Sequence, residues 1–370
     1  MHTHTINLLG AAPGVRHSLT VLQFGSGAGP KATIQAALHA DEVPALLVAQ
    51  VLRQRLLTLE AEGALRGTVQ LVPYANPLGL AQHLLGTHLG RFDLRDGLNF
   101  NRGHAELAAA VQARVEGRMG DDPAANVARV RAALREAAAA LPAETPGQDL
   151  KRRLVQTAID SDIVLDLHAD GEAAMHLYAL TPQADLAGEL GALLGARAVL
   201  LATESGDSPF DEACSRPWLL LQQALAPAPL PLACFSATVE LRGEADTSHA
   251  LAAQDAEALL QFLQRRGVIE GLPPALPVPR CEPTPLAGSE PLSAPVAGVV
   301  VFHAAVGDMV TPGTLVADVV DVESGALHPV VARSAGVLYA RSGTRWATPG
   351  KRLGKVAGVT LARTGRLLSP

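Results

Sequence analysis

The sequence predicts an α/β unit with a mostly parallel or mixed sheet and helices on both faces, followed by a small, barrel-like all-β unit. In residues 1–270, short apolar runs alternate with helical patterns, which is typical of βαβ units. Residues 271–285 are rich in proline and are expected to form a connector, because proline is poorly tolerated inside helices and sheets. In residues 286–370, valine-rich segments are separated by glycine turns, which indicates short strands.

The elements of the α/β unit follow from the apolar pattern. Strands are predicted where short apolar runs end at polar residues, and helices where apolar residues recur every three or four positions. The predicted strands are residues 33–38, 68–72, 163–167, 198–201 and 234–241. The predicted helices are residues 45–59, 105–115, 126–140, 185–194 and 250–264. Pro44 suits the first turn of a helix, where its missing N–H costs nothing.

The composition is that of a globular protein. Hydrophobic residues make up 48% of the 370 residues and charged residues 18%, which excludes a disordered chain. A net charge of -6 without a basic stripe argues against a nucleic-acid partner. We find neither a signal sequence nor an apolar run of membrane-spanning length, so a cytoplasmic protein without membrane contact is expected. Cys214, Cys234 and Cys281 are too widely spaced to indicate disulfides or a zinc knuckle.

A repeated motif indicates a metal site. Leu-His-Ala-Asp occurs at residues 38–41 and again at 167–170, each time after a predicted strand. In sheets of this class, ligands bind beyond the carboxyl ends of the strands. His39 and Glu42 have the His-x-x-Glu spacing, and His168 adds a second imidazole. Two imidazoles and one carboxylate are the protein ligands of a catalytic zinc site, which keeps its fourth position open for water.

Other polar residues occupy similar positions. Asn76 follows the strand predicted at 68–72, and Glu240 lies near the end of the strand predicted at 234–241. We therefore expect both to meet His39 and His168 at one edge of the sheet. A carboxylate inside an apolar strand needs a reason to be there, and the alternative to a catalytic role for Glu240 is an ion pair with Arg242.

These motifs together resemble the succinylglutamate desuccinylase and aspartoacylase family, a deacylase branch of the zinc carboxypeptidase fold. The resemblance spans roughly residues 30 to 265 and implies that His39, Glu42 and His168 bind one zinc ion per chain. It also implies that Glu240 is the general base. The motifs that carry it are His39-Ala40-Asp41-Glu42, Asn76-Pro77, residues 96–102, Asp166-Leu167-His168 and Val239-Glu240-Leu241.

The resemblance further implies a set of substrate-binding residues. Asn101 and Arg102 would hold a substrate carboxylate, and an arginine shortly upstream would polarise the scissile carbonyl. Arg91 is the preferred candidate for that role and Arg95 the alternative. Family members often continue Asn-Arg with Phe-Pro-Gly, whereas this chain continues with Gly103-His104. The loop after Arg102 is therefore expected to differ from that of its relatives.

The C-terminal unit resembles the half-barrel of biotinyl and lipoyl carrier domains. A carrier needs a lysine at the tip of its central hairpin, but this chain has Asp321-Val322-Glu323-Ser324-Gly325 there, and Lys351 and Lys355 come only near the end. We therefore expect no covalent cofactor in this unit. It is interpreted as a structural or lid-forming appendage.

Together with the resemblance to the deacylase family, the residues favour a zinc-dependent hydrolase that cleaves the amide bond of a small N-acyl amino-acid-like substrate. A zinc carboxypeptidase acting on peptides would use the same site, and a noncatalytic binding protein on this fold is the more distant alternative. Asp166 and Asp170 flank His168, and either is suited to orient its imidazole. The sequence leaves open the acyl group, the amine, the role of residues 103–160 and whether the chain forms homo-oligomers.

Overall fold

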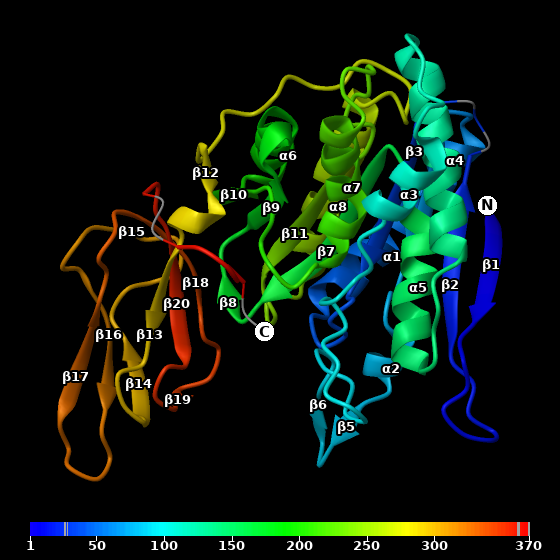
Figure 1. The fold of residues 1–370 in the computed structure, drawn as a ribbon. Helices are drawn as coiled ribbons and strands as arrows, with labels where there is room; N and C mark the ends of the chain where they lie inside the picture. Colours follow the sequence, from blue (N-terminus) through cyan, green and yellow to red (C-terminus); the bar gives the residue numbers. More distant parts are fainter. Residues whose placement is uncertain (26, 28, 361–362, 369–370) are drawn as a thin grey trace.

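The structure is a computed structural model that describes residues 1–25, 27, 29–360 and 363–368. A nine-stranded mixed sheet lies at its centre, with helices on both faces (Figure 1). The strands of this sheet are β1 His2–Asn7, β2 Ser18–Phe24, β3 Lys31–Ala36, β4 Thr68–Val72, β7 Ile163–Asp170, β9 His176–Leu180, β10 Ala198–Ala202, β11 Phe235–Gly243 and β12 Pro283–Pro285. Their spatial order is β1-β2-β4-β3-β7-β11-β9-β10-β12. The predicted α/β class and mixed sheet are confirmed.

The central strands β4, β3, β7 and β11 run parallel to one another, so their carboxyl ends share one edge of the sheet. Ala36, the last residue of β3, is in register with Leu167 on β7. His168 on β7 is in register with Glu240 on β11. This register brings the polar residues that follow or end these strands to neighbouring positions.

Helices cover the sheet in two layers, each with its own apolar core. The helices are α1 Pro44–Ala61, α2 Pro77–Leu80, α3 Ala108–Val115, α4 Pro123–Ala139, α5 Pro146–Ala158, α6 Ala184–Leu194, α7 Phe210–Ala224 and α8 His249–Arg265, with 3-10 turns at Thr181–Gln183 and Leu286–Gly288. One core contains buried residues of α1, α6 and α8, and the other contains those of α3, α4, α5 and α7. No helix in the described part of the chain is both long and apolar enough to cross a membrane.

Several elements were not predicted, for identifiable physical reasons. Helix α7 contains Pro217, and proline inside a sequence normally argues against a helix. Helix α5 was not predicted either, although the capping box between Thr145 and Gln148 is a sequence signal for its start. The proline-rich connector was expected to be irregular, but its last three residues form β12, which pairs in parallel with β10. Proline is tolerated there because β12 is the edge strand of the sheet.

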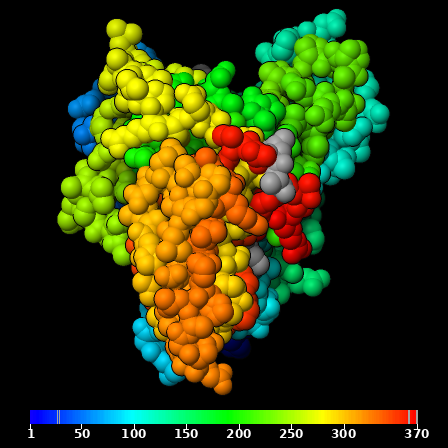
Figure 2. All heavy atoms as spheres, turned by 90° about the vertical axis from the view of Figure 1, so that its left-hand side faces the viewer, coloured from blue at the N-terminus to red at the C-terminus, as the bar shows by residue number. Residues whose placement is uncertain are grey.

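The C-terminal part of the chain forms two antiparallel sheets around a small apolar core, as the valine and glycine pattern predicts. Their strands are β13 Glu290–Ser293, β14 Gly298–Phe302, β15 Met309–Val310, β16 Leu315–Val320, β17 Leu327–Val331, β18 Gly336–Arg341, β19 Trp346–Ala347 and β20 Arg352–Ala357. The short strand β8 Glu172–Ala173 of the α/β unit pairs with β18, while β5 His83–Leu84 and β6 Thr87–His88 form a separate hairpin. Figure 2 shows these sheets as a ridge on one face of the molecule.

Candidate metal centre and active site

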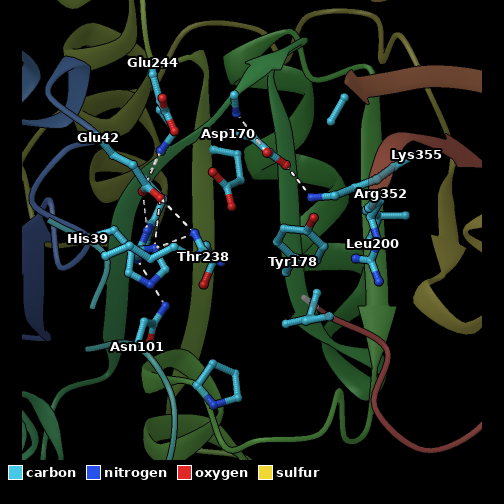
Figure 3. A pocket seen from close by; sticks show the side chains of 18 of the residues that line it. His39, Glu42, Asn101, Asp170, Tyr178, Leu200, Thr238, Glu244, Arg352 and Lys355 are labelled. Atoms are coloured by element: carbon cyan, nitrogen blue, oxygen red, sulfur yellow. Dashed lines mark hydrogen bonds and ion pairs between the residues drawn. The ribbon is translucent and has the colours of Figure 1, made fainter. Parts of the chain in front are cut away.

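His39, Glu42 and His168 form one buried cluster at the carboxyl ends of the central strands. Each offers a ligand atom, and these atoms lie within 4.8 Å of one another. Nδ1 of His39 is 2.9 Å from Oε1 of Glu42, and Nδ1 of His168 is 2.6 Å from Oε2 of the same carboxylate (Figure 3). The structure therefore brings together the three residues that the sequence predicts as ligands.

The loop that carries His39 is held in an unusual conformation. Ala37, directly after β3, has a positive φ of 57°, which costs a non-glycine residue on the order of 1 kcal/mol. Its N–H donates to the Leu167 carbonyl at 3.0 Å, so the turn is tied to β7. The Nδ2 atom of Asn76 donates to the Leu38 carbonyl at 2.9 Å. Helix α1 then begins at Pro44, as predicted.

The expectation that Asn76 meets the other polar groups in the site is wrong. Asn76 is fully buried and caps α2, where its Oδ1 accepts a hydrogen bond from the Gly79 N–H at 2.8 Å. It does not line the cavity that contains the cluster. Through its hydrogen bond to Leu38 it supports the loop that carries His39. A position after a strand does not tell whether a residue lines the site or supports a loop.

Outer partners orient both imidazoles toward the cluster. Nε2 of His39 is 3.0 Å from Oδ1 of Asn99, and Nε2 of His168 is 2.9 Å from Oδ2 of Asp166. Both oxygens accept hydrogen bonds, which places a proton on Nε2 of each ring and turns Nδ1 toward the cluster, where it would bind the metal ion. This is the arrangement of metal-binding histidines, so the residues present fit a divalent metal ion. Of the two flanking acids, Asp166 orients His168.

Charge is distributed unevenly in the cluster. Burial, together with the positive charge of Arg91, lowers the pKa of His39 to about 4, so this imidazole is neutral. Burial opposes ionisation of Glu42, but the two histidines hold its pKa well below the usual value. For His168, burial is outweighed by the carboxylates of Asp166 and Glu42, which raise its pKa. Glu42 therefore supplies a fixed negative charge at the centre of the site.

Glu240 faces the same site from the neighbouring strand. It lines a cavity of about 950 Å³ together with the three cluster residues, and its buried Oε2 has no hydrogen-bond partner. Burial and the negative charge of Glu42 raise the pKa of Glu240 to about 8. The alternative ion pair is not formed, because Arg242 instead donates to Asp255, with an Nη1 to Oδ1 distance of 3.1 Å.

The geometry distinguishes the two arginines considered upstream. Arg91 lines the cavity, and its Nη1 lies 3.2 Å from Nδ1 of His39 and 3.5 Å from Oε1 of Glu42. Arg95 is outside the cavity lining and is held by Asp93, with an Nε to Oδ1 distance of 2.9 Å. Arg91 is thus placed where a substrate can reach it, whereas Arg95 supports its own loop.

Asn101 and Arg102 also line the cavity. Nδ2 of Asn101 is 3.2 Å from Nε2 of His168. The Nη1 of Arg102 donates to the Asn101 carbonyl at 2.7 Å, and the Arg102 carbonyl accepts from Lys151 Nζ. The divergent Gly103-His104 segment is fixed through its backbone, because both N–H groups donate to carbonyls of residues 207 and 208, at 2.6 and 3.0 Å.

The opposite wall of the cavity comes from the C-terminal sheets. Arg341, Arg352 and Lys355 line it, and Figure 3 shows Lys355 and Arg352 across the pocket from the His39 cluster. Lys355 Nζ donates to Asp170. Burial opposes ionisation of Asp170, but Lys355 lowers its pKa to about 2. The sequence interpretation missed these cations because they belong to no motif, and only the folded arrangement brings them to the site.

Comparisons with known proteins agree with this geometry. Residues 28–266 match the family model of the succinylglutamate desuccinylase/aspartoacylase catalytic domain. A solved succinylglutamate desuccinylase/aspartoacylase family protein from Shewanella amazonensis SB2B is 28% identical, with a TM-score of 0.84 over 96% of this chain and 98% of its own. A similarly named protein from Shewanella frigidimarina NCIMB 400 is 24% identical, with a TM-score of 0.86 over 96% and 97% of the two chains.

More distant likenesses show the fold alone. The product-bound ectoine utilization protein EutE (DoeB) from Ruegeria pomeroyi is 18% identical, with a TM-score of 0.66 over 97% of this chain and 95% of its own. No curated protein sequence matches the chain. The family match covers more than half of the chain and includes every residue of the His39, Glu42 and His168 cluster. The chain therefore belongs to the succinylglutamate desuccinylase/aspartoacylase family, which is a family of hydrolases.

Proposed function

We propose that the protein is a zinc-dependent hydrolase that removes the acyl group from a small N-acyl amino-acid-like substrate. The observation that carries this proposal is the buried His39, Glu42 and His168 cluster beside the unpartnered carboxylate oxygen of Glu240. A zinc ion bound by the cluster would lower the pKa of its bound water toward ~7 and polarise the amide carbonyl. Membership of a hydrolase family supports the same reaction class.

The surrounding side chains are assigned to the remaining steps. Glu240 would accept a proton from the attacking water and pass it to the leaving nitrogen. A zinc ion bound beside Glu42 would offset the negative charge that raises the pKa of Glu240, so that its carboxylate is ionised for this transfer. Arg91 donates hydrogen bonds to the carbonyl oxygen as negative charge develops on it. Asn101 and Arg102 hold the substrate carboxylate, for which the planar guanidinium offers parallel donors.

The cavity favours a small substrate over a peptide. Its volume of about 950 Å³ lies within the range of small-molecule sites. The C-terminal sheets provide a wall opposite the cluster, with Lys355 and Arg352 in it. We propose that residues from about 286 onward act as a separate β unit that provides this wall. A carboxypeptidase needs an open groove for the rest of its peptide, and a noncatalytic protein would not need Glu240 beside the cluster.

A substrate comparison tests this proposal. Zinc-loaded protein is assayed for amine release from N-acetyl and N-succinyl amino acids, and from peptides of two to six residues. We expect kcat/KM for the best acyl amino acid to exceed that for every peptide by at least about 10-fold, and a chelator to abolish the activity until zinc is restored. A preference for peptides would favour the carboxypeptidase. Folded, zinc-loaded protein that cleaves neither class would contradict an enzymatic function.

A further inference from the structure

Asp211, in the first turn of α7, is a buried acid that the proposed reaction does not use. Asp211 is one of the residues that line the cavity, and it is 5% exposed. Its Oδ1 is buried without a hydrogen-bond partner, and none of the ion pairs made by the described residues includes it. Burying a carboxylate without a counter-charge is costly, so this position needs an explanation.

The immediate neighbour of Asp211 increases that cost. Glu212 is also buried at the cavity wall, where its Oε1 accepts a hydrogen bond from the Ser205 N–H at 2.7 Å. Burial and the charge of Glu212 raise the pKa of Asp211 to about 7. Glu212 thus has a partner, whereas the Asp211 oxygen does not. A cation that entered the cavity would compensate the negative charge of Asp211.

Asp211 is coupled by structure to the residues assigned to the substrate carboxylate. The N–H of Phe210, which precedes it, donates to Oδ1 of Asn101 at 2.8 Å. The pKa of Arg102 is lowered by burial and by the charge of Arg91. The negative charge of Asp211 acts in the opposite direction and favours the charged guanidinium. An acid and a guanidinium therefore line the same cavity. This pairing complements a molecule that carries both an ammonium group and a carboxylate.

We propose that Asp211 binds the free ammonium group of a substrate whose carboxylate is held by Arg102. The substrate class is then an acylated diamino acid, in which one nitrogen carries the scissile acyl group and the other is free. This inference rests on the proposed deacylase function and makes it more specific. A monoamino acid acylated on its only nitrogen would leave Asp211 buried and unpaired, whereas an ammonium group would form a charge-assisted hydrogen bond with it.

Matched substrate pairs test the inference. Nα-acetyl-lysine is compared with Nα-acetyl-norleucine, and Nε-acetyl-lysine with 6-acetamidohexanoate; the ornithine series is treated in the same way. Within each pair the main difference is the ammonium group. We expect kcat/KM to be at least about 10-fold higher for the ammonium-bearing compound in at least one pair, the usual effect of a hydrogen bond between charged groups. Equal values in every pair would overturn the inference.

Variants connect the preference to the residue. In Asp211→Asn the ratio of kcat/KM within the preferred pair should fall to about 1. The matched control is Glu204→Gln, because Glu204 is a nearby acid outside the cavity lining, with a side chain 60% exposed and paired with Arg216. This control should keep the parent ratio. An unchanged ratio in Asp211→Asn, or a loss of zinc from that variant, would contradict a substrate-binding role.

The two proposals fail in different ways. Hydrolysis of acylated monoamino acids without any preference for an ammonium group would leave the deacylase function intact and overturn the role of Asp211. If zinc-loaded protein hydrolyses none of the compounds, the deacylase function fails. Calorimetry with the same compounds then still measures whether the ammonium group strengthens binding by at least about 10-fold. Equal affinities within every pair would overturn the role of Asp211 independently of turnover.

Discussion

Lys355 donates a hydrogen bond from Nζ to Asp170, and this contact joins strand β20 to the end of strand β7, two residues beyond His168. Both side chains are largely buried, at 18% and 25% exposure. Close by, the Ala174 N–H donates to the Tyr339 carbonyl at 2.8 Å. The wall formed by the C-terminal sheets is thus attached to the strand that carries a candidate metal ligand.

Replacing Lys355 should destabilise the protein. Lys355→Met leaves Asp170 without its cation, which we expect to lower the free energy of unfolding by about 2–3 kcal/mol. Urea denaturation measures this change. The double variant Asp170→Asn/Lys355→Met should be more stable than the single variant, because no unpaired charge remains. A single variant as stable as the parent would show that the pair contributes nothing to the attachment.

Replacing Asp166 should weaken metal binding. Asp166→Asn removes the carboxylate that accepts from His168 Nε2, and we expect a loss of about 10–100-fold in zinc affinity. Competition with a chromophoric chelator measures this affinity. Asp185→Asn, at an exposed position on α6, serves as the control and should bind zinc like the parent. Equal affinity in the Asp166 variant would mean that this carboxylate does not support a metal ligand.

Replacing Glu240 should affect the chemical step. Glu240→Gln keeps the shape of the side chain but cannot accept a proton, so kcat should fall by about 10²–10⁴-fold. Zinc content, measured by atomic emission, should remain at the parent level because Glu240 is outside the ligand cluster. Turnover near that of the parent would exclude Glu240 as the general base.

Replacing Arg102 should affect substrate binding. Arg102→Ala should raise KM more than it lowers kcat, because a carboxylate held equally in the ground and transition states contributes to binding alone. The comparison substrate is the carboxamide analogue, which lacks the negative charge and should be nearly unaffected by the change. If the variant loses the same factor in kcat/KM for acid and carboxamide, Arg102 does not recognise the carboxylate.

His104 should make stability depend on pH. Burial, together with the charge of Lys151, lowers its pKa in the folded protein to about 3, against about 6.5 in an unfolded chain. Between these values the unfolded state binds the proton and the folded state does not, so the free energy of unfolding falls as the pH drops from about 6.5 toward 3. In His104→Phe this slope should decrease by about one proton. Parallel curves for parent and variant, from urea denaturation at pH 4.5 to 7.5, would contradict the prediction.

The sequence was most informative where buried strands end in polar residues. Strand β4 has the predicted bounds, and β7 and β10 begin at the predicted residues. The apolar runs define these strands because both faces of a parallel sheet are buried. The sequence also predicts that His39, Glu42 and His168 lie together, because each follows or ends a strand of the same sheet. Strand ends of a parallel sheet lie together wherever they occur in the chain.

The parts of the site that could not be predicted depend on tertiary contacts. Asp211 lies on α7, which the sequence did not predict because Pro217 argues against a helix there. Its neighbours at the cavity come from other segments of the chain. Lys355 reaches Asp170 across 185 residues of chain, with no motif that links the two. Asn76 follows a strand like the cluster residues, yet it supports a loop. Side-chain direction and long-range docking decide these roles, and neither is contained in local periodicity.

The cavity is lined by two parts of the chain, and each part contains an apolar core. The residues assigned to bond cleavage belong to the central sheet and the loops beside it, whereas Arg341, Arg352 and Lys355 lie on an antiparallel sheet. Mutations of Arg341 or Arg352 can therefore alter which molecules are accepted without changing the metal ligands. This separation gives the scaffold a route to new substrates during evolution, and gives protein engineers a segment to randomise without touching the metal ligands.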